Sequence, residues 1–186
     1  MITSINVPVH STFHRVASGY PSGRMPTSML GEIRPPRRVL DYSDAYVPPP
    51  HQRVLGERAL AGISNLLNLP PAWDGRRALP IADRAAKSVL RATLMVADDS
   101  SLTPQYFPLP NGGIQVEWQA AGAGLEIECD PEGDCHVLAV NHSNEVVLEF
   151  ARPSRDGSDD WARAARFLRD LGDLVRTRSS ADDQSV

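Results

Sequence analysis

The clearest pattern in the chain is an alternation of apolar and polar residues in its second half. The alternation runs through residues 114–119 and again through 125–129, with glycines at 122 and 124 between them. A period of two is typical of a strand with one buried face, and glycine favours a tight turn. Two further segments with apolar residues, 135–140 and 146–150, follow short turns. The pattern therefore predicts a four-stranded antiparallel meander.

Strand parity divides the side chains of this sheet between two faces. Glu117, Glu126 and Glu128 share one face by parity. Between Asn111 and Phe150 the sequence contains eight acidic residues and no Lys or Arg, so we expect this face to be negatively charged. We expect the opposite face to be buried and to carry Ile114, Val116, Trp118, Leu125, Ile127, Val146, Leu148 and Phe150.

Three other segments have apolar residues at helical spacing. The first helix is predicted over 54–69, before two prolines, and the second over 80–98, with Pro80 at its first position. The third is predicted to follow Ser158 as N-cap and to end near residue 178. Two helices before the sheet and one after it predict an α+β fold with the helices on one face.

The first 52 residues differ in composition from the rest of the chain. Eight of the 16 prolines lie within the first 50 residues, and no sustained apolar period precedes Val54. Such a composition favours disorder in isolation. Up to Arg58 the chain has seven Arg against four acidic residues. We therefore expect a disordered, basic, proline-rich arm over 1–52, a single domain over 53–178 and a mobile tail over 179–186.

The whole chain of 186 residues is mildly acidic, with a formal net charge of −4. No apolar run approaches the roughly 18 residues of a membrane-spanning helix. The first ten residues lack the basic start and hydrophobic segment of a secretory signal. Two cysteines are too few for a disulfide framework. These features predict a cytoplasmic protein that does not bind a membrane.

Four potential zinc ligands, Cys129, Cys135, His136 and His142, lie close together in the sequence. Their spacing differs from that of a zinc finger, in which paired ligands are two to four residues apart. Parity places the two cysteines opposite each other on the buried side and turns His136 to the other face. We therefore favour two packed thiols, and we expect no metal and no cofactor.

Three interpretations of Glu117, Glu126 and Glu128 stay open. They can form a solvated outer surface, a docking surface for a basic protein, or a site for a divalent metal in a hydrolase. The last lacks a usual companion, because restriction-type nucleases place a Lys shortly after the second acid. The only Lys in the chain is Lys87, on a predicted helix.

Other candidate residues lie before the sheet. Arg34, Arg37 and Arg38 of the arm can contact phosphates, although a contact with the acidic body of the same protein is the stronger expectation. Trp73, in the string W-D-G, is expected to be buried between helices beside a turn. The alternative for Trp73 is an exposed anchor for a partner.

Two segments resemble a group of small bacterial proteins. Residues 69–75 read L-P-P-A-W-D-G, and residues 108–118 read P-L-P-N-G-G-I-Q-V-E-W, followed by L-E-I-E at 125–128. The group shares a W-D-G segment and a later P-x-P-x-G-G-x-Q-x-E-W segment, but Arg76 and Arg77 stand where it often has an aromatic and a small residue. The resemblance implies a shared fold core and no particular activity.

The sequence contains no nucleophile elbow and no phosphate loop. We therefore favour a non-catalytic protein that binds another protein, such as an antitoxin, an immunity protein or an accessory subunit. The alternatives are a divalent-metal-dependent hydrolase or nuclease that uses the acidic face, and a nucleic-acid binder that uses the arm. The candidate binding residues are Glu117, Glu126, Glu128, Trp73, Arg37 and Arg38.

Overall fold

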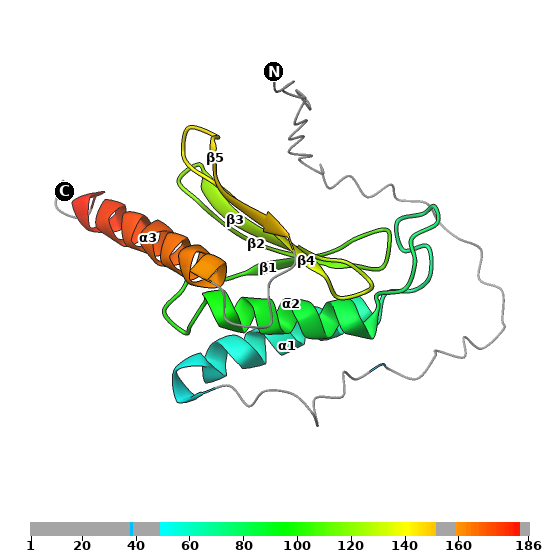
Figure 1. The fold of residues 1–186 in the computed structure, drawn as a ribbon. Coiled ribbons are helices and arrows are strands. Elements are labelled where there is room, and N and C mark those ends of the chain that lie inside the picture. Colours follow the sequence, from blue (N-terminus) through cyan, green and yellow to red (C-terminus); the bar gives the residue numbers. More distant parts are fainter. Residues whose placement is uncertain (1–37, 39–48, 152–158, 183–186) are drawn as a thin grey trace, which may run out of the picture. The chain divides into compact units, whose positions relative to one another are not determined.

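The computed structural model describes residues 38, 49–151 and 159–182. They form a five-stranded antiparallel sheet in the order β1-β2-β3-β4-β5, together with three α-helices and one short 3-10 turn (Figure 1). The α+β class is therefore confirmed. The elements are η1 (Pro50–Gln52), α1 (Arg53–Leu67), α2 (Asp83–Val96), β1 (Gln105–Pro108), β2 (Ile114–Ala120), β3 (Ala123–Cys129), β4 (Cys135–Val140), β5 (Val146–Ala151) and α3 (Asp159–Asp182).

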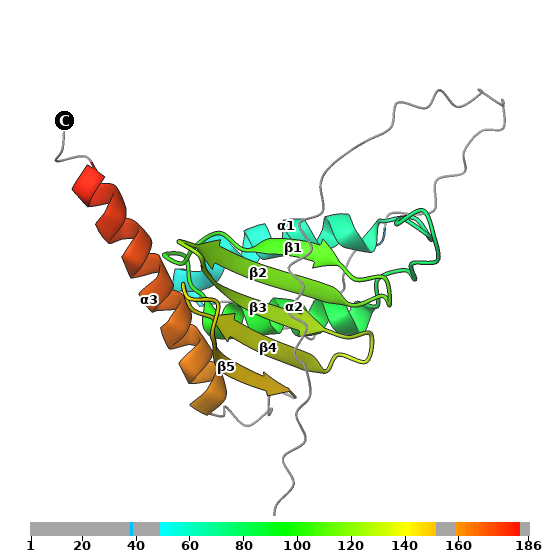
Figure 2. The same cartoon turned by 90° about the horizontal axis from the view of Figure 1, so that it is seen from above.

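The core lies between one face of the sheet and the helices. When the sheet is seen from above, it lies in front of α1 and α2 (Figure 2). Trp118 and Ile127 of the sheet are 0% exposed, and they belong to the same buried cluster as Ile63 of α1, Val89 of α2 and Leu168 of α3. The helices thus pack on the face that alternation predicted to be buried.

The sheet has five strands, one more than the predicted four-stranded meander. β1 is the missed strand, and it pairs along the free edge of β2, with Tyr106 opposite Val116. It is four residues long and ends at Pro108, so it offers too few positions for a period of two to be recognised. A proline is tolerated there because β1 is an edge strand.

The prediction that Val146 is buried is wrong, since this residue is 48% exposed. The register between β4 and β5 shifts between Ala139 and Val140. A bulge of this kind adds one residue to a strand and reverses the parity beyond it. Leu148 therefore faces the core, where it is 6% exposed, while Val146 does not.

The helices begin and end close to the predicted positions, with differences at the start of α2 and at the end of α3. α2 begins at Asp83 rather than at Pro80. The segment before it makes backbone hydrogen bonds to the β1–β2 connection instead: Leu79 donates to Pro110 O and Ala82 to Gly112 O, both at 2.9 Å. α3 continues to residue 182, beyond the predicted end near 178, and the predicted N-cap at 158 lies outside the described residues.

These hydrogen bonds join residues 79–82 to the P-L-P-N-G-G segment, and the glycines at 112 and 113 allow the close approach. A Cβ on Gly112, whose φ is +92°, would lie 2.8 Å from the carbonyl oxygen of Pro80. A Cβ on Gly113 would lie 2.6 Å from the carbonyl oxygen of Cys129. No larger residue fits without movement of the backbone.

The packed part of the chain begins before residue 53, within the segment predicted to be the arm. Gln52 is buried, and its Nε2 donates to the carbonyl oxygens of Leu94 at 2.7 Å and Ala97 at 2.9 Å. Residue 52 therefore connects the start of α1 with the end of α2. Residues 1–37, 39–48 and 183–186 lie outside the described residues, and with them most of the predicted arm and the end of the predicted tail. Within the described part of the chain, no helix is long and apolar enough to cross a membrane.

The Gly113→Ala substitution is expected to lower the free energy of unfolding by about 1–3 kcal/mol, because the added methyl group forces the backbone of β3 to move. Urea denaturation measures this loss. Gly172→Ala is the matched control, because its Cβ would meet nothing closer than 3.5 Å and alanine favours a helix by about 1 kcal/mol. Equal stability of Gly113→Ala and the parent protein would show that the close approach is not a constraint.

Candidate functional site

The predicted acidic residues lie on the sheet face that points away from the helices, which we call the outer face. Glu117 of β2 is directly opposite Glu126 of β3, and Gln115 is opposite Glu128. On the next strand His136 is opposite Glu128. The structure therefore brings the three predicted glutamates together on two adjacent strands, in neighbouring cross-strand rows.

The carboxyl groups of Glu117 and Glu126 have different surroundings. Glu117 accepts hydrogen bonds from the side-chain amides of Gln115 and Gln119, the latter at 2.8 Å. Glu126 makes no hydrogen bond or ion pair with any described residue. Burial raises the pKa of Glu126 to about 7, and the charges of Glu117 and Glu128 add to this shift while His136 opposes it. Burial also raises the pKa of Glu117, against the two amide hydrogen bonds.

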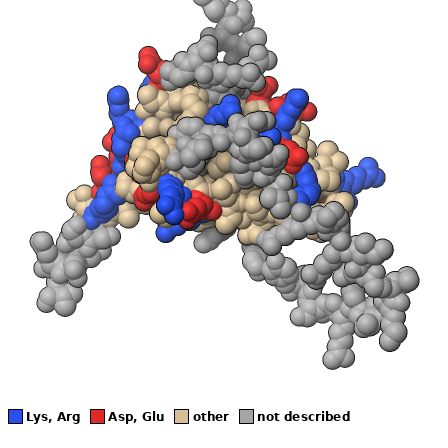
Figure 3. All heavy atoms as spheres, turned by 90° about the horizontal axis from the view of Figure 1, so that it is seen from below, with Lys and Arg blue, Asp and Glu red and all other residues tan. Residues whose placement is uncertain are grey.

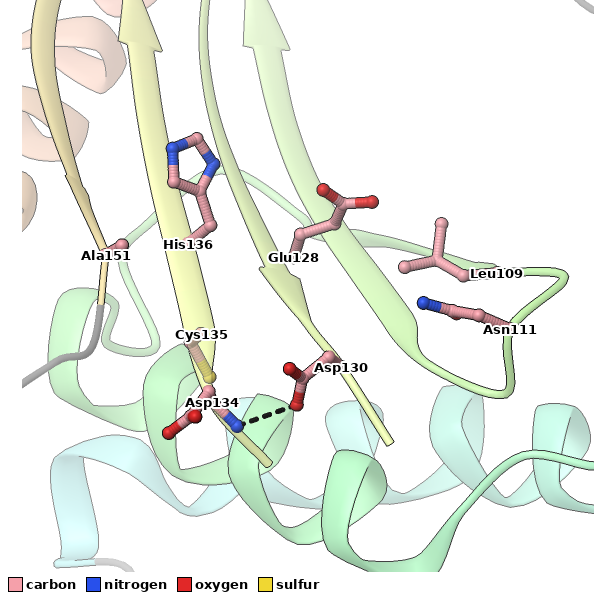
Figure 4. A pocket seen from close by; sticks show the side chains of 8 residues that line it. All are labelled: Leu109, Asn111, Glu128, Asp130, Asp134, Cys135, His136 and Ala151. Carbon is pink, nitrogen blue, oxygen red and sulfur yellow. Dashed lines mark hydrogen bonds between the residues drawn. The ribbon is translucent and has the colours of Figure 1, made fainter. Parts of the chain in front are cut away.

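A hollow of about 300 Å³ lies at one end of the outer face, beside the β3–β4 turn. Figure 4 shows Glu128 and His136 on neighbouring strands above Asp130 and Asp134. The backbone N–H of Asp134 donates to Oδ1 of Asp130 at 2.9 Å, and His136 Nε2 lies 3.1 Å from Oε1 of Glu149. The hollow thus combines three carboxyl groups with one imidazole that is already paired.

Cys129 and Cys135 form a disulfide at the base of the same turn. They are register partners with a Cα–Cα distance of 4.1 Å, and neither is more than 4% exposed. The prediction that the two residues face each other is confirmed, but the prediction of two free thiols is wrong. The two residues are direct cross-strand partners, which brings their sulfur atoms together. The sequence pattern that could have predicted the bond is C-x5-C across a short Pro-Glu-Gly turn. Structural disulfides are typical of oxidising compartments, so cytoplasmic location stays a prediction.

The described residues contain no group of three or more His, Cys, Asp or Glu that is arranged to hold a metal ion. Both cysteines of the considered zinc set are bonded to each other. His142 is exposed in the β4–β5 turn, away from the row of His136. The hydrolase alternative therefore has no preformed ligand set in this part of the chain.

The W-D-G string builds a turn. Oδ1 of Asp74 accepts the backbone N–H groups of Arg76 at 2.8 Å and Ala78 at 3.1 Å, and these hydrogen bonds lower the pKa of Asp74. Gly75 adopts a φ of +74°, which favours glycine. Trp73 is partly buried, and its Nε1 is buried without a partner among the described residues. The predicted turn is thus confirmed, and Trp73 lies in the connection between α1 and α2 rather than on a strand of the sheet.

Arg38 contacts the body of the same protein. Its backbone N–H donates to Oδ1 of Asn68 at 2.9 Å, and its guanidinium donates to Ile81 O at 2.9 Å and pairs with Asp83. These contacts lie at the end of α1 and at the start of α2, so the structure does not bring Arg38 together with the three glutamates. Arg34 and Arg37 lie outside the described residues.

Comparison with known proteins finds no matching family model, no similar curated protein and no similar solved structure. The resemblance to the W-D-G group of small bacterial proteins therefore stays a prediction. A function for this chain has to be inferred from its own residues.

Glu126→Gln is expected to change how stability depends on pH. Because folding raises the pKa of Glu126 from 4.5 to about 7, the folded state binds the proton more tightly, and its stability falls as pH rises through this window. Glutamine stays neutral, so the variant should exceed the parent by about 1 kcal/mol at pH 8 and equal it near pH 4. Urea denaturation at both pH values measures this, with exposed Glu132→Gln as control. The same pH response in both variants would contradict the assignment.

Reduction of the disulfide is expected to lower the free energy of unfolding by about 2 kcal/mol, because the bond closes a short loop in the unfolded chain. Urea denaturation with and without a reductant measures the loss. The double variant Cys129→Ala/Cys135→Ala serves as control, since it should not respond to the reductant. Identical unfolding curves of the parent protein in both conditions would contradict a stabilising role.

Proposed function

We propose that this protein is a non-catalytic binding module that holds a cationic segment of another protein on its outer face. The observation that carries the proposal is that the carboxyl group of Glu126 lacks a partner among the described residues. This partly buried carboxyl group has no hydrogen bond or ion pair among the described residues, and it has Glu117 opposite it on β2 and Glu128 two residues along its own strand. A lysine or arginine from a partner would supply the missing counter-charge.

Electrostatics favours a cationic partner for this face. Carboxylates placed side by side repel each other, and this repulsion costs stability in the free protein. A bound cation removes the repulsion and lowers the pKa of Glu126, so the carboxylate forms as the partner binds. Complementary charge also speeds encounter and selects against acidic partners.

The mixture of side chains on this face suits a protein segment. Phe107 is opposite Gln115 in the register, and it is 39% exposed. Leu138 is opposite Glu126 and partly buried. Apolar side chains beside charged ones are typical of protein interfaces, in which an aromatic residue often anchors the contact. Antitoxins, immunity proteins and accessory subunits are the kinds of protein that we expect to work in this way.

The two alternative functions have less support. The metal-dependent hydrolase needs a ligand set that the described residues do not provide. The nucleic-acid binder relies on arm residues, of which Arg38 is engaged with Ile81 and Asp83. A carboxylate-rich sheet face would repel phosphates.

The proposal is tested by binding of an Arg-Ala repeat peptide to the full chain at low ionic strength, measured by calorimetry. Glu126→Gln/Glu128→Gln is expected to weaken binding by about tenfold or more, because both carboxylates contact the cation. Glu57→Gln/Asp170→Asn makes the same change in net charge on the helices, and it should leave affinity nearly unchanged. An equal loss in both double variants would show attraction to net charge only and would contradict the proposal.

Binding of the same peptide is also expected to depend on pH. Since burial raises the pKa of Glu126 to about 7, protons compete with the cation below this value, and affinity should rise between pH 6 and pH 8. Glu126→Gln should abolish this rise. A pH-independent affinity of the parent protein would place the peptide elsewhere.

A further inference from the structure

A second hollow lies on the other side of the sheet, between α2, the β3–β4 turn and the start of α3, and has a volume of about 520 Å³. Figure 3 views the helix side, where Lys and Arg side chains are interspersed with acidic ones. The hollow is lined by Arg84, Lys87, Ser88 and Arg91 from α2, by Glu132, Gly133 and Asp134 from the turn, and by Trp161 from α3.

Three cationic side chains of α2 line this hollow. Arg84, Lys87 and Arg91 are spaced by three and four residues, so they share one face of the helix. The row spans two helical turns, or about 10 Å. None of the three makes an ion pair or a side-chain hydrogen bond with a described residue. In contrast, Arg53 and Arg163 pair with acids on their own helices.

The wall opposite α2 is held in place by close packing. A Cβ on Gly133, whose φ is +90°, would lie 2.9 Å from Ser88 Oγ and 3.6 Å from Arg84 Cβ. The β3–β4 turn therefore touches α2 directly, and the Cys129–Cys135 disulfide links the two strands that flank this turn. The hollow is thus formed by elements with little freedom to move apart.

Trp161 of α3 carries a spectroscopic probe at the hollow, its indole N–H. The residue is 4% exposed and lines the hollow, and its indole Nε1 is buried without a hydrogen-bond partner among the described residues. A buried indole N–H usually has an acceptor. The side chain itself lines the hollow, so its signal reports what binds there.

We propose that this hollow binds a small phosphate-bearing molecule, with its phosphate oxygens on Arg84, Lys87 and Arg91. Its volume is in the range of sites for small molecules, and Arg and Lys are the residues that most often bind phosphate. A row of about 10 Å accommodates two linked phosphates. Glu132 and Asp134 on the turn repel them, which directs the phosphates toward α2 and limits affinity.

Inorganic pyrophosphate is the probe for this site, added to the full chain at low ionic strength and followed by the indole N–H signals in an NMR spectrum. The chain has three tryptophans, so the three signals can be told apart by single Trp→Phe variants. The chemical shift of the Trp161 signal should change as pyrophosphate is added and then reach a plateau, while the signals of Trp73 and Trp118 should not move. Pyrophosphate should bind more tightly than monophosphate because it reaches more of the cations.

Charge variants locate the site. Arg84→Gln/Arg91→Gln is expected to weaken pyrophosphate binding by about tenfold or more, whereas Arg166→Gln/Arg169→Gln on α3 has the same change in net charge and should have little effect. Glu132→Gln should strengthen binding, because it removes repulsion at the rim. Absence of a saturable shift at Trp161, or an equal loss in both double variants, would overturn the proposal. The peptide experiment on the outer face is unaffected by either result.

Discussion

The period of two in the central strands is the constraint on which the rest of the structure depends. Successive side chains of a strand must point to opposite faces, so a chain that buries Trp118 has to place Glu117 on the other side. Trp118 is 0% exposed and packs in the cluster that includes all three helices. The same alternation therefore builds the core and leaves a carboxylate-rich face that the helices do not cover.

Close backbone contacts at one end of the sheet hold this arrangement in place. Gly112 and Gly113 let the β1–β2 connection approach the segment before α2 and the carbonyl of Cys129. The disulfide and the Asp130–Asp134 hydrogen bond close the neighbouring β3–β4 turn. Both hollows border this turn. The positions of Glu128 on one side and of the α2 cations on the other are thus set by the same small part of the chain.

Much of this architecture could be predicted from the sequence, because long periodic segments carry a strong signal. The α+β class, the three helices and the shared face of Glu117, Glu126 and Glu128 are features of this kind. β1 was missed because four residues that end in a proline show no period. Val146 was misplaced because a bulge leaves no mark in the hydrophobic pattern. The disulfide was missed because spacing alone does not distinguish two neighbouring free thiols from two cysteines joined by a disulfide bond.

The site was predictable only in part, because parity shows which residues share a face but not which hydrogen-bond or charge partners each side chain has. Only the structure reveals that Glu117 accepts hydrogen bonds from two side-chain amides, that Glu126 accepts none from the described residues, and that Arg38 pairs with Asp83.

The most direct measurement of binding at the outer face is carbodiimide labelling of carboxyl groups in the purified protein and in an extract of its native host. The account predicts that Glu126 and Glu128 are labelled less in the extract while Glu57 is labelled equally. Equal labelling of all three in both samples would contradict a binding role for the outer face.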